Sequence, residues 1–174
     1  MATTKTAANR RRPGASASSK STRAPNRRAA GRSQASDLSL LRDRLAISDL
    51  ILSFAYAVDT RDHRRYCDNF TPDGVLELPF GRFEGRSAIE AMQQPKIGNG
   101  SHHLSSNHMI AIDGDTASAR SYVIATHIFD LAKPRDIAQA GGWYDYELRR
   151  TPKGWRFARV KLTIVWETAD MMRG

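Results

Sequence analysis

The stretch DLSLLRDRLAISDLILSFAYAVD, residues 37–59, decides the fold class because it holds the longest regular pattern in the chain. Large apolar residues recur through it at helical spacing, which predicts one long amphipathic helix with a broad buried stripe. Ser36 or Asp37 is suited to cap the N-terminus, so we expect the helix to begin there and to end at Asp59. The residues of the expected stripe are Ile47, Leu50, Ile51, Phe54, Ala55 and Val58.

Beyond residue 74 the apolar period changes from about 3.6 residues to about two, which marks a change from helices to strands. A second short helix is expected over residues 62–70, and Pro72-Asp73-Gly74 reads as a turn. The expected later elements are strands at 75–78 and 82–84, a helix at 86–93, and strands at 102–112, 116–131, 142–150 and 155–167. Helices followed by an antiparallel meander predict an α+β fold, in which the long helix covers one face of a curved sheet and a pocket lies between them.

Positive charge is concentrated at the N-terminus. Residues 1–36 contain nine Lys or Arg and no Asp or Glu, whereas the rest of the chain holds 18 basic and 18 acidic residues. The N-terminal segment has hardly any large apolar side chain, so we expect a disordered basic tail over 1–35, a folded domain over 36–170 and a short tail over 171–174. The composition of residues 1–36 also resembles that of an organelle transit peptide, but the segment shows no clear amphipathic face. It lacks aromatic residues for base stacking, so we expect no specific nucleic-acid partner.

Cys67 is the only cysteine, which excludes an internal disulfide and a thiolate metal cluster. No apolar run approaches the ~18 residues of a membrane span, and the N-terminus lacks the apolar core of a secretory signal. We therefore expect a cytoplasmic protein with no membrane partner. No nucleotide, flavin or metal motif is present, so we expect no cofactor and no metal.

Asp59 is the most informative polar residue. It follows Ile51 by eight residues and Ala55 by four, which puts it on the buried stripe, near the helix end whose dipole disfavours a carboxylate. A carboxylate there is costly for stability, which points to a functional role. The alternative is that the helix ends at Val58 and that Asp59 begins a solvated turn.

Histidines gather on the first two long strands. His102, His103 and His108 lie on the first, where the functional reading is a general base or a metal site and the ordinary reading is a partly exposed hydrogen-bonding residue. His127 shares strand parity with Val123 and Phe129, which suggests the inner face of the sheet. A buried histidine needs a partner, because burial without one is costly.

Four segments together resemble the SnoaL-like branch of the nuclear transport factor 2-like superfamily: RLAISDLILSFAYAVDTRD, FTPDGVLELPFGRFEGRSAIEAM, HHLSSNHMIAIDGDTASARSYV and WYDYELRRTPKGWRFARVKLTIVW. The resemblance spans residues 36–170 and implies a cone of helices packed on a strongly curved antiparallel sheet. Two enzymes of this superfamily, scytalone dehydratase and hexachlorocyclohexane dehydrochlorinase, share an Asp–His pair. The resemblance places that pair at Asp59 and His103.

The resemblance also implies further pocket residues. The dehydratase has a second pocket histidine twelve residues after a turn acid, and His127 stands twelve residues after Asp115. Val58 and Leu78 stand where the dehydratase has tyrosines, and Tyr144 stands where it has an asparagine, so we do not expect scytalone as the substrate. The residues expected to line a substrate pocket are Tyr56, Leu78, Tyr144 and Trp166, the last because it shares strand parity with Leu162 and Ile164.

Two functions follow from these expectations. The first is a cofactor-independent lyase or isomerase for a small apolar or aromatic, polyketide-type molecule. In it His103 removes a proton, Asp59 orients His103, and His127 or Tyr144 stabilises developing charge. The second is a non-catalytic small-molecule-binding or assembly subunit of the same fold. In both cases the resemblance implies a homo-oligomer, a dimer or a trimer, whose partner is otherwise only a small molecule.

Overall fold

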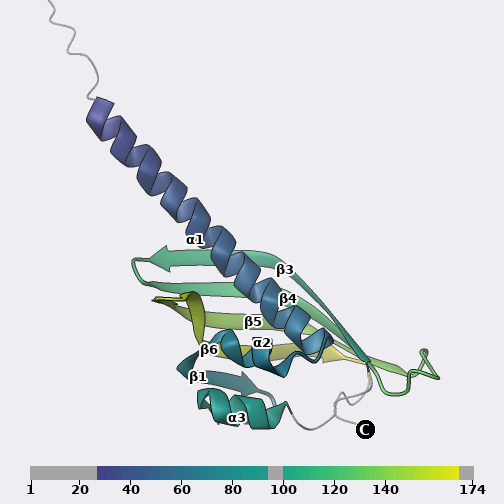
Figure 1. The fold of residues 1–174 in the computed structure, drawn as a ribbon. Helices are drawn as coiled ribbons and strands as arrows, with labels where there is room; N and C mark the ends of the chain where they lie inside the picture. Colours follow the sequence, from purple (N-terminus) through teal and green to yellow (C-terminus); the bar gives the residue numbers. More distant parts are fainter. Residues whose placement is uncertain (1–26, 94–99, 169–174) are drawn as a thin grey trace, which may run out of the picture.

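The computed structural model describes residues 27–93 and 100–168 of the 174-residue chain. The elements follow in the order α1 (Arg27–Asp59), α2 (His63–Asp68), β1 (Phe70–Leu78), β2 (Gly81–Glu84), α3 (Gly85–Met92), β3 (Gly100–Asp113), β4 (Thr116–Ile128), β5 (Ile137–Thr151) and β6 (Gly154–Glu167). Figure 1 shows the three helices on one side of a curved sheet, with α1 crossing it obliquely.

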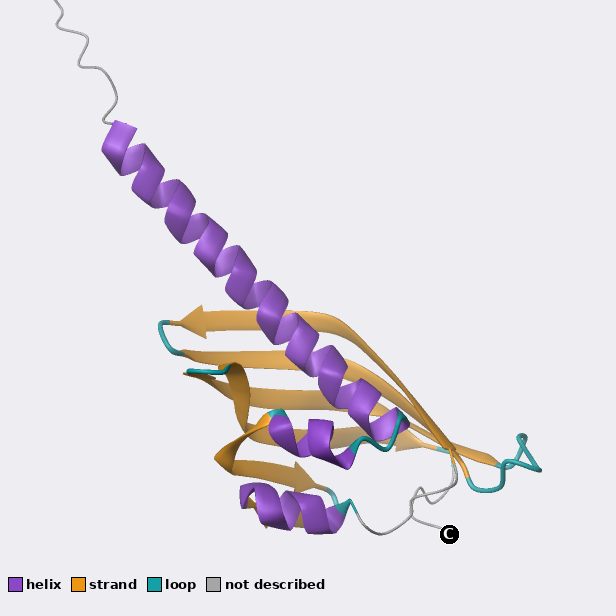
Figure 2. Cartoon of the chain, in the orientation of Figure 1, coloured by secondary structure: helices purple, strands orange, loops and turns teal. Residues whose placement is uncertain are grey.

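The six described strands form one sheet in the order β2-β1-β6-β5-β4-β3. β3 to β6 form an antiparallel meander, and β1 joins its far edge parallel to β6. Figure 2 shows the layering, with helices over one face and the other face uncovered by any described helix. The expected α+β fold, a helical layer on a strongly curved and mostly antiparallel sheet, is confirmed.

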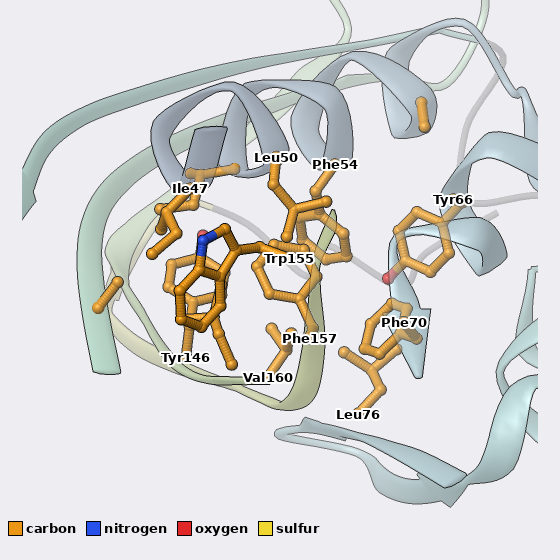
Figure 3. Close-up of a cluster of buried hydrophobic side chains, with 14 of the residues drawn as sticks. Ile47, Leu50, Phe54, Tyr66, Phe70, Leu76, Tyr146, Trp155, Phe157 and Val160 are labelled. Carbon is orange, nitrogen blue, oxygen red and sulfur yellow. The ribbon is translucent and has the colours of Figure 1, made fainter. Parts of the chain in front are cut away.

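The core lies between α1 and the inner face of the sheet (Figure 3). Its centre is aromatic: the ring of Phe54 on α1 stacks on Tyr66 at a centroid distance of 4.7 Å and meets Phe157 edge-on at 5.6 Å. Such pairs add about 0.5–1.5 kcal/mol each beyond the area they bury. This cluster holds the C-terminal half of α1 against the sheet.

The expected N-terminal boundary was wrong. α1 begins at Arg27, so the helix needs no cap at Ser36 or Asp37, and residues 27–35 belong to a helix rather than to a disordered tail. Ala, Arg and Gln have high helix propensity, so this segment can be helical without any apolar periodicity. Residues 1–26 and 169–174 lie outside the described residues, so the remainder of both expected tails stays a prediction.

The expected turn at Pro72-Asp73-Gly74 lies inside β1 instead. The pairing of β1 with β6 shifts register between Phe70 and Val75, so the three residues form an irregularity in an edge region of the sheet. Pro and Gly are tolerated where a ladder is interrupted in this way.

Within 27–93 and 100–168, the helices are too short or too polar to cross a membrane.

Candidate active site

The C-terminus of α1 places Asp59 at the site. The N–H of Asp62 donates to the carbonyl of Ala57 at 3.0 Å, and the N–H of Arg61 donates to that of Val58 at 3.2 Å. These two bonds, with Arg61 at φ 55°, form a Schellman motif, which makes Asp59 the last helical residue. The alternative in which Asp59 starts a solvated turn therefore does not hold.

Strand β3 brings its partners to Asp59. Alternation along the strand turns Ser101 and His103 toward α1 and leaves His102 exposed on the other face. His103 Nδ1 lies 2.6 Å from Asp59 Oδ1, and Ser101 Oγ donates to the same oxygen at 3.0 Å. The backbone N–H of His103 donates to Asp59 Oδ2 at 2.8 Å. Both carboxylate oxygens are thus occupied by groups from one strand.

These bonds determine the state of both side chains. Partial burial opposes ionisation of Asp59, but the hydrogen bonds from His103 outweigh it, so the pKa of the carboxyl lies below its ordinary value. An ionised carboxylate only accepts hydrogen bonds, so Nδ1 of His103 carries the proton and Nε2 is left as the basic nitrogen. The His103 side chain is 8% exposed and lines a cavity, with Asp59 behind it.

His127 lies beside this pair. It sits on the inner face of β4, and its ring centroid is 5.7 Å from that of His103. Burial, and then the proximity of His103 and Arg61, lowers the pKa of His127 to about 4, so the ring is neutral at neutral pH. Its Nδ1 is buried and has no hydrogen-bond partner among the described residues. A neutral imidazole beside a base can donate or accept one hydrogen bond to a bound molecule.

The cavity has a volume of about 360 Å³, within the ordinary range for small-molecule sites. Its polar lining residues include Arg61, Ser101, His103 and His127. Its apolar lining residues include Leu78, Pro79, Phe80, Met92, Leu162 and Ile164. The arrangement suits a small, mainly apolar molecule that presents one polar end to the histidines.

Two of the four expected lining residues are in the cavity wall. Leu78 contributes to the apolar side, and Tyr144 lies on the inner face of β5. Burial, and then the charge of Asp59, raises the pKa of Tyr144, so its hydroxyl keeps its proton and can donate a hydrogen bond. Its ring meets Phe54 edge-on at 5.5 Å, so the core packing holds it in place.

The other two expectations were wrong. Tyr56 lies on the outer side of α1, 56% exposed, with the guanidinium of Arg65 5.0 Å above its ring. The physical reason is helix phase: two residues after Phe54, a side chain points about 200° around the helix, away from the sheet.

Trp166 is 45% exposed and lies on the outer face of the sheet, where it covers Gly141. The pairing of β5 with β6 shifts register between Gly141 and Gly142: Gly142 is opposite Ile164, but Gly141 is opposite Trp166. The additional residue, Val165, forms a β-bulge and reverses the alternation beyond it. Glu167, rather than Trp166, therefore reaches the cavity.

The remaining histidine of the expected cluster lies elsewhere. His108 sits between α1 and β3, with Nδ1 2.8 Å from Ser48 Oγ and Nε2 3.2 Å from Ser105 Oγ. Burial lowers its pKa. Within the described part of the chain, no three His, Cys, Asp or Glu side chains are arranged to hold a metal ion.

Sequence reasoning missed several polar residues of the site, among them Ser101, Arg61 and Glu167. Ser101 could have been found, because it stands two residues before His103 and shares its face. Arg61 occupies the left-handed position that ends α1, where glycine is the usual residue, and its side chain lines the cavity. Glu167 carried no local signal, because its orientation depends on the bulge at Val165.

Comparison with known proteins identifies a family and similar sequences. The family model described as the SnoaL-like domain matches residues 39–161. An uncharacterised protein of Mycobacterium tuberculosis (strain ATCC 25618 / H37Rv) is 32% identical over 123 residues, which are 68% of this chain and 83% of that protein.

Solved structures extend the comparison. A proposed aromatic ring hydroxylase from Novosphingobium aromaticivorans is 31% identical, with a TM-score of 0.66 over 76% of this chain and 98% of that one. A proposed scytalone dehydratase from the same species is 24% identical (TM-score 0.68; 76% and 90% covered). Hexachlorocyclohexane dehydrochlorinase from Novosphingobium barchaimii is 19% identical (TM-score 0.67; 76% and 92% covered), and these two likenesses show the fold alone.

The family model covers well over half of the chain, and the fold that it implies is the fold observed. This protein belongs to the SnoaL-like domain family.

Proposed function

We propose that this protein is a cofactor-independent lyase, of the dehydratase or dehydrohalogenase class, that acts on a small and mainly apolar molecule. One observation carries the proposal: the 2.6 Å contact between His103 Nδ1 and Asp59 Oδ1, on the wall of a cavity of about 360 Å³. A histidine oriented by a carboxylate in this way is a general base whose protonated form the carboxylate stabilises.

The reaction begins with proton abstraction. Nε2 of His103 takes a proton from a carbon of the substrate, the C–H electron pair forms a carbon–carbon double bond, and the bond to the leaving group breaks with its electron pair on that group. Asp59 stabilises the imidazolium that forms. If the leaving group is hydroxide, the imidazolium returns its proton and water departs; if it is a halide, the proton passes to solvent.

The remaining polar groups would stabilise charge on the substrate. His127 is neutral at neutral pH, and the Tyr144 hydroxyl keeps its proton, so both can donate a hydrogen bond to a carbonyl or leaving-group oxygen. The low-polarity wall around Leu78 and Ile164 strengthens these interactions by excluding water. An isomerase would share the first step and return the proton to a different carbon.

A second candidate is a non-catalytic binding or assembly subunit. It is favoured by the 31% identity to a proposed aromatic ring hydroxylase, a protein class whose name implies redox chemistry that an Asp–His pair does not perform. In that case the cavity would hold an apolar ligand, and His103 would serve as a hydrogen-bonding residue.

Proton exchange separates the two candidates without knowledge of the full reaction. The purified chain is incubated in D₂O with β-hydroxy ketones and halogenated cyclohexanes that stabilise it in a thermal shift assay, and NMR follows deuterium incorporation and release of water or halide. The lyase proposal expects elimination by the wild type and a loss of about 10²–10⁴-fold in His103→Gln and Asp59→Asn.

His102→Gln is the matched control, because His102 adjoins His103 on the same strand but is exposed on the other face. It should retain wild-type rates. Binding without exchange or elimination by the wild type would support the second candidate, and undiminished turnover in His103→Gln would exclude His103 as the base.

A further inference from the structure

Helix α1 has a second apolar face that nothing in the described chain covers. Leu38, Leu41, Leu45 and Leu52 are 55%, 56%, 65% and 47% exposed. Figures 1 and 2 show the N-terminal half of α1 extending beyond the edge of the sheet. Exposed contiguous leucines on a surface of this kind mark an interaction site.

The four leucines form one stripe. They are three, four and seven residues apart, which is the spacing of the a and d positions of a helix–helix seam. At 100° per residue, Leu45 lies about 160° around the helix from the buried Ile47, so this outer stripe is opposite the core stripe. Tyr56 falls on the outer stripe as well, which explains its exposure.

We propose that the outer stripe of α1, from Leu38 to Tyr56, binds the outer stripe of α1 in a second copy of this chain, antiparallel, with the two-fold axis at Leu45. Leu38 and Leu52 stand seven residues on either side of Leu45. An antiparallel pair centred there sets Leu38 against Leu52 of the partner subunit and Leu45 against Leu45 of the partner subunit. A two-fold interface requires this self-complementarity.

Charge supports the same register. Arg42 stands three residues before Leu45 and Asp49 stands four after it, and both lie on the same flank of the outer stripe. The two-fold axis therefore brings Arg42 next to Asp49 of the partner subunit, and Asp49 next to Arg42 of the partner subunit. Opposite charges beside an apolar seam set the orientation and register of paired helices. The stripe is about 27 Å long, enough for a two-helix interface.

A second exposed apolar surface competes for this role. Leu104 on β3, Ile124 and Tyr122 on β4, and Trp166 on β6 are 54%, 42%, 45% and 45% exposed on the outer face of the sheet. That surface shows no comparable symmetry of sequence and charge. It serves instead as the control for the experiment.

Light scattering of the full chain at micromolar concentration provides the first test. The wild-type particle should contain an even number of chains, and Leu45→Glu should halve its mass, whereas Ile124→Glu on the sheet should not prevent α1 pairing. Arg42→Glu and Asp49→Arg should each weaken self-association at least tenfold, and the double variant should restore it. A wild-type particle of one or three chains would overturn the proposal.

Disulfide trapping tests the direction of pairing. In a Cys67→Ala background, oxidation should cross-link Leu45→Cys to itself, and Leu38→Cys only when Leu52→Cys is also present. Self-cross-linking of Leu38→Cys alone would indicate a parallel pair and contradict the antiparallel one. Circular dichroism of each variant confirms the fold, since every substituted stripe residue is exposed.

Discussion

The imidazole of His103 and the carboxylate of Asp59 are 2.6 Å apart although 44 residues separate them in sequence. The contact joins the last helical residue of α1 to the fourth residue of the edge strand β3, and the backbone N–H of His103 donates to the same carboxylate. Asp59 thereby fixes both the position and the tautomer of the imidazole.

Strand β3 begins at Gly100, three residues before His103. This position places its side chain on the inner face of the strand, level with the end of α1.

The first prediction concerns the tautomer of His103. In Asp59→Asn, the new amide NH₂ group faces Nδ1 of His103 and donates a hydrogen bond to it. This bond favours the tautomer of His103 that carries its proton on Nε2. That tautomer has no basic nitrogen directed at the cavity, so proton abstraction should fall by roughly 10²–10⁴-fold while the fold is retained. Nitrogen-15 NMR of the imidazole reports the tautomer directly. An unchanged Nδ1–H tautomer in the variant would contradict the assigned role of Asp59.

The second prediction concerns pH. The pKa of His127 is about 4 in the folded protein against an ordinary value of 6.5, so between these pH values the unfolded chain binds more protons than the folded one. Stability from burying the neutral ring is complete above about pH 6.5 and is lost as the pH falls toward 4. In His127→Gln, the loss of unfolding free energy between pH 7 and pH 4.5 should be smaller than in the wild type.

Urea unfolding at the two pH values measures this difference, with His102→Gln as a control for an exposed histidine. Equal losses in wild type and His127→Gln would show that His127 is not held neutral by burial.

The third prediction tests the bulge that turns Trp166 outward. A Cβ on Gly141 would lie 2.3 Å from the Trp166 ring, whereas a Cβ on Gly142 would lie 1.9 Å from the carbonyl oxygen of Thr163. Gly141→Ala should lower stability by about 1 kcal/mol, because the half-exposed ring can turn away, and Gly142→Ala should lower it more. Trp166→Ala should relieve the effect of Gly141→Ala but not that of Gly142→Ala.

A double-mutant cycle from thermal or urea unfolding provides the coupling energies. Strictly additive effects of Gly141→Ala and Trp166→Ala would show that the ring does not cover Gly141.

The fourth prediction concerns the N-terminus. The first strong anchors of α1 are Asp43, which accepts hydrogen bonds from Arg150 and from Trp155 Nε1 at 2.7 and 3.0 Å, and Arg44, which donates to the carbonyl of Ile110 at 2.8 Å. Deletion of residues 1–35 keeps all of these contacts, so the melting temperature should change little. Deletion of residues 1–44 removes them and should lower it clearly. A large loss of stability in the shorter deletion would show that the basic segment supports the fold.

Much of the fold could be predicted because its patterns are local. Helical spacing from Ile47 to Val58 identifies the buried face of α1, and two-residue alternation identifies the inner faces of β3 and β4. The same patterns, with the resemblance, brought Asp59, His103 and His127 forward as candidates. The start of α1 at Arg27 was missed because Ala, Arg and Gln support a helix without any apolar periodicity.

The sequence by itself determined which residues face inward within each regular segment, because a side chain's direction there depends only on its place in a 3.6- or two-residue repeat. Only the tertiary structure decided what happens where a repeat is interrupted. The bulge at Val165 arises from the pairing of β6 with β5, and it exchanges Trp166 for Glu167 at the cavity. The distance between Asp59 and His103 was likewise decided by the packing of α1 on the sheet, because no local repeat relates residues so far apart in the chain.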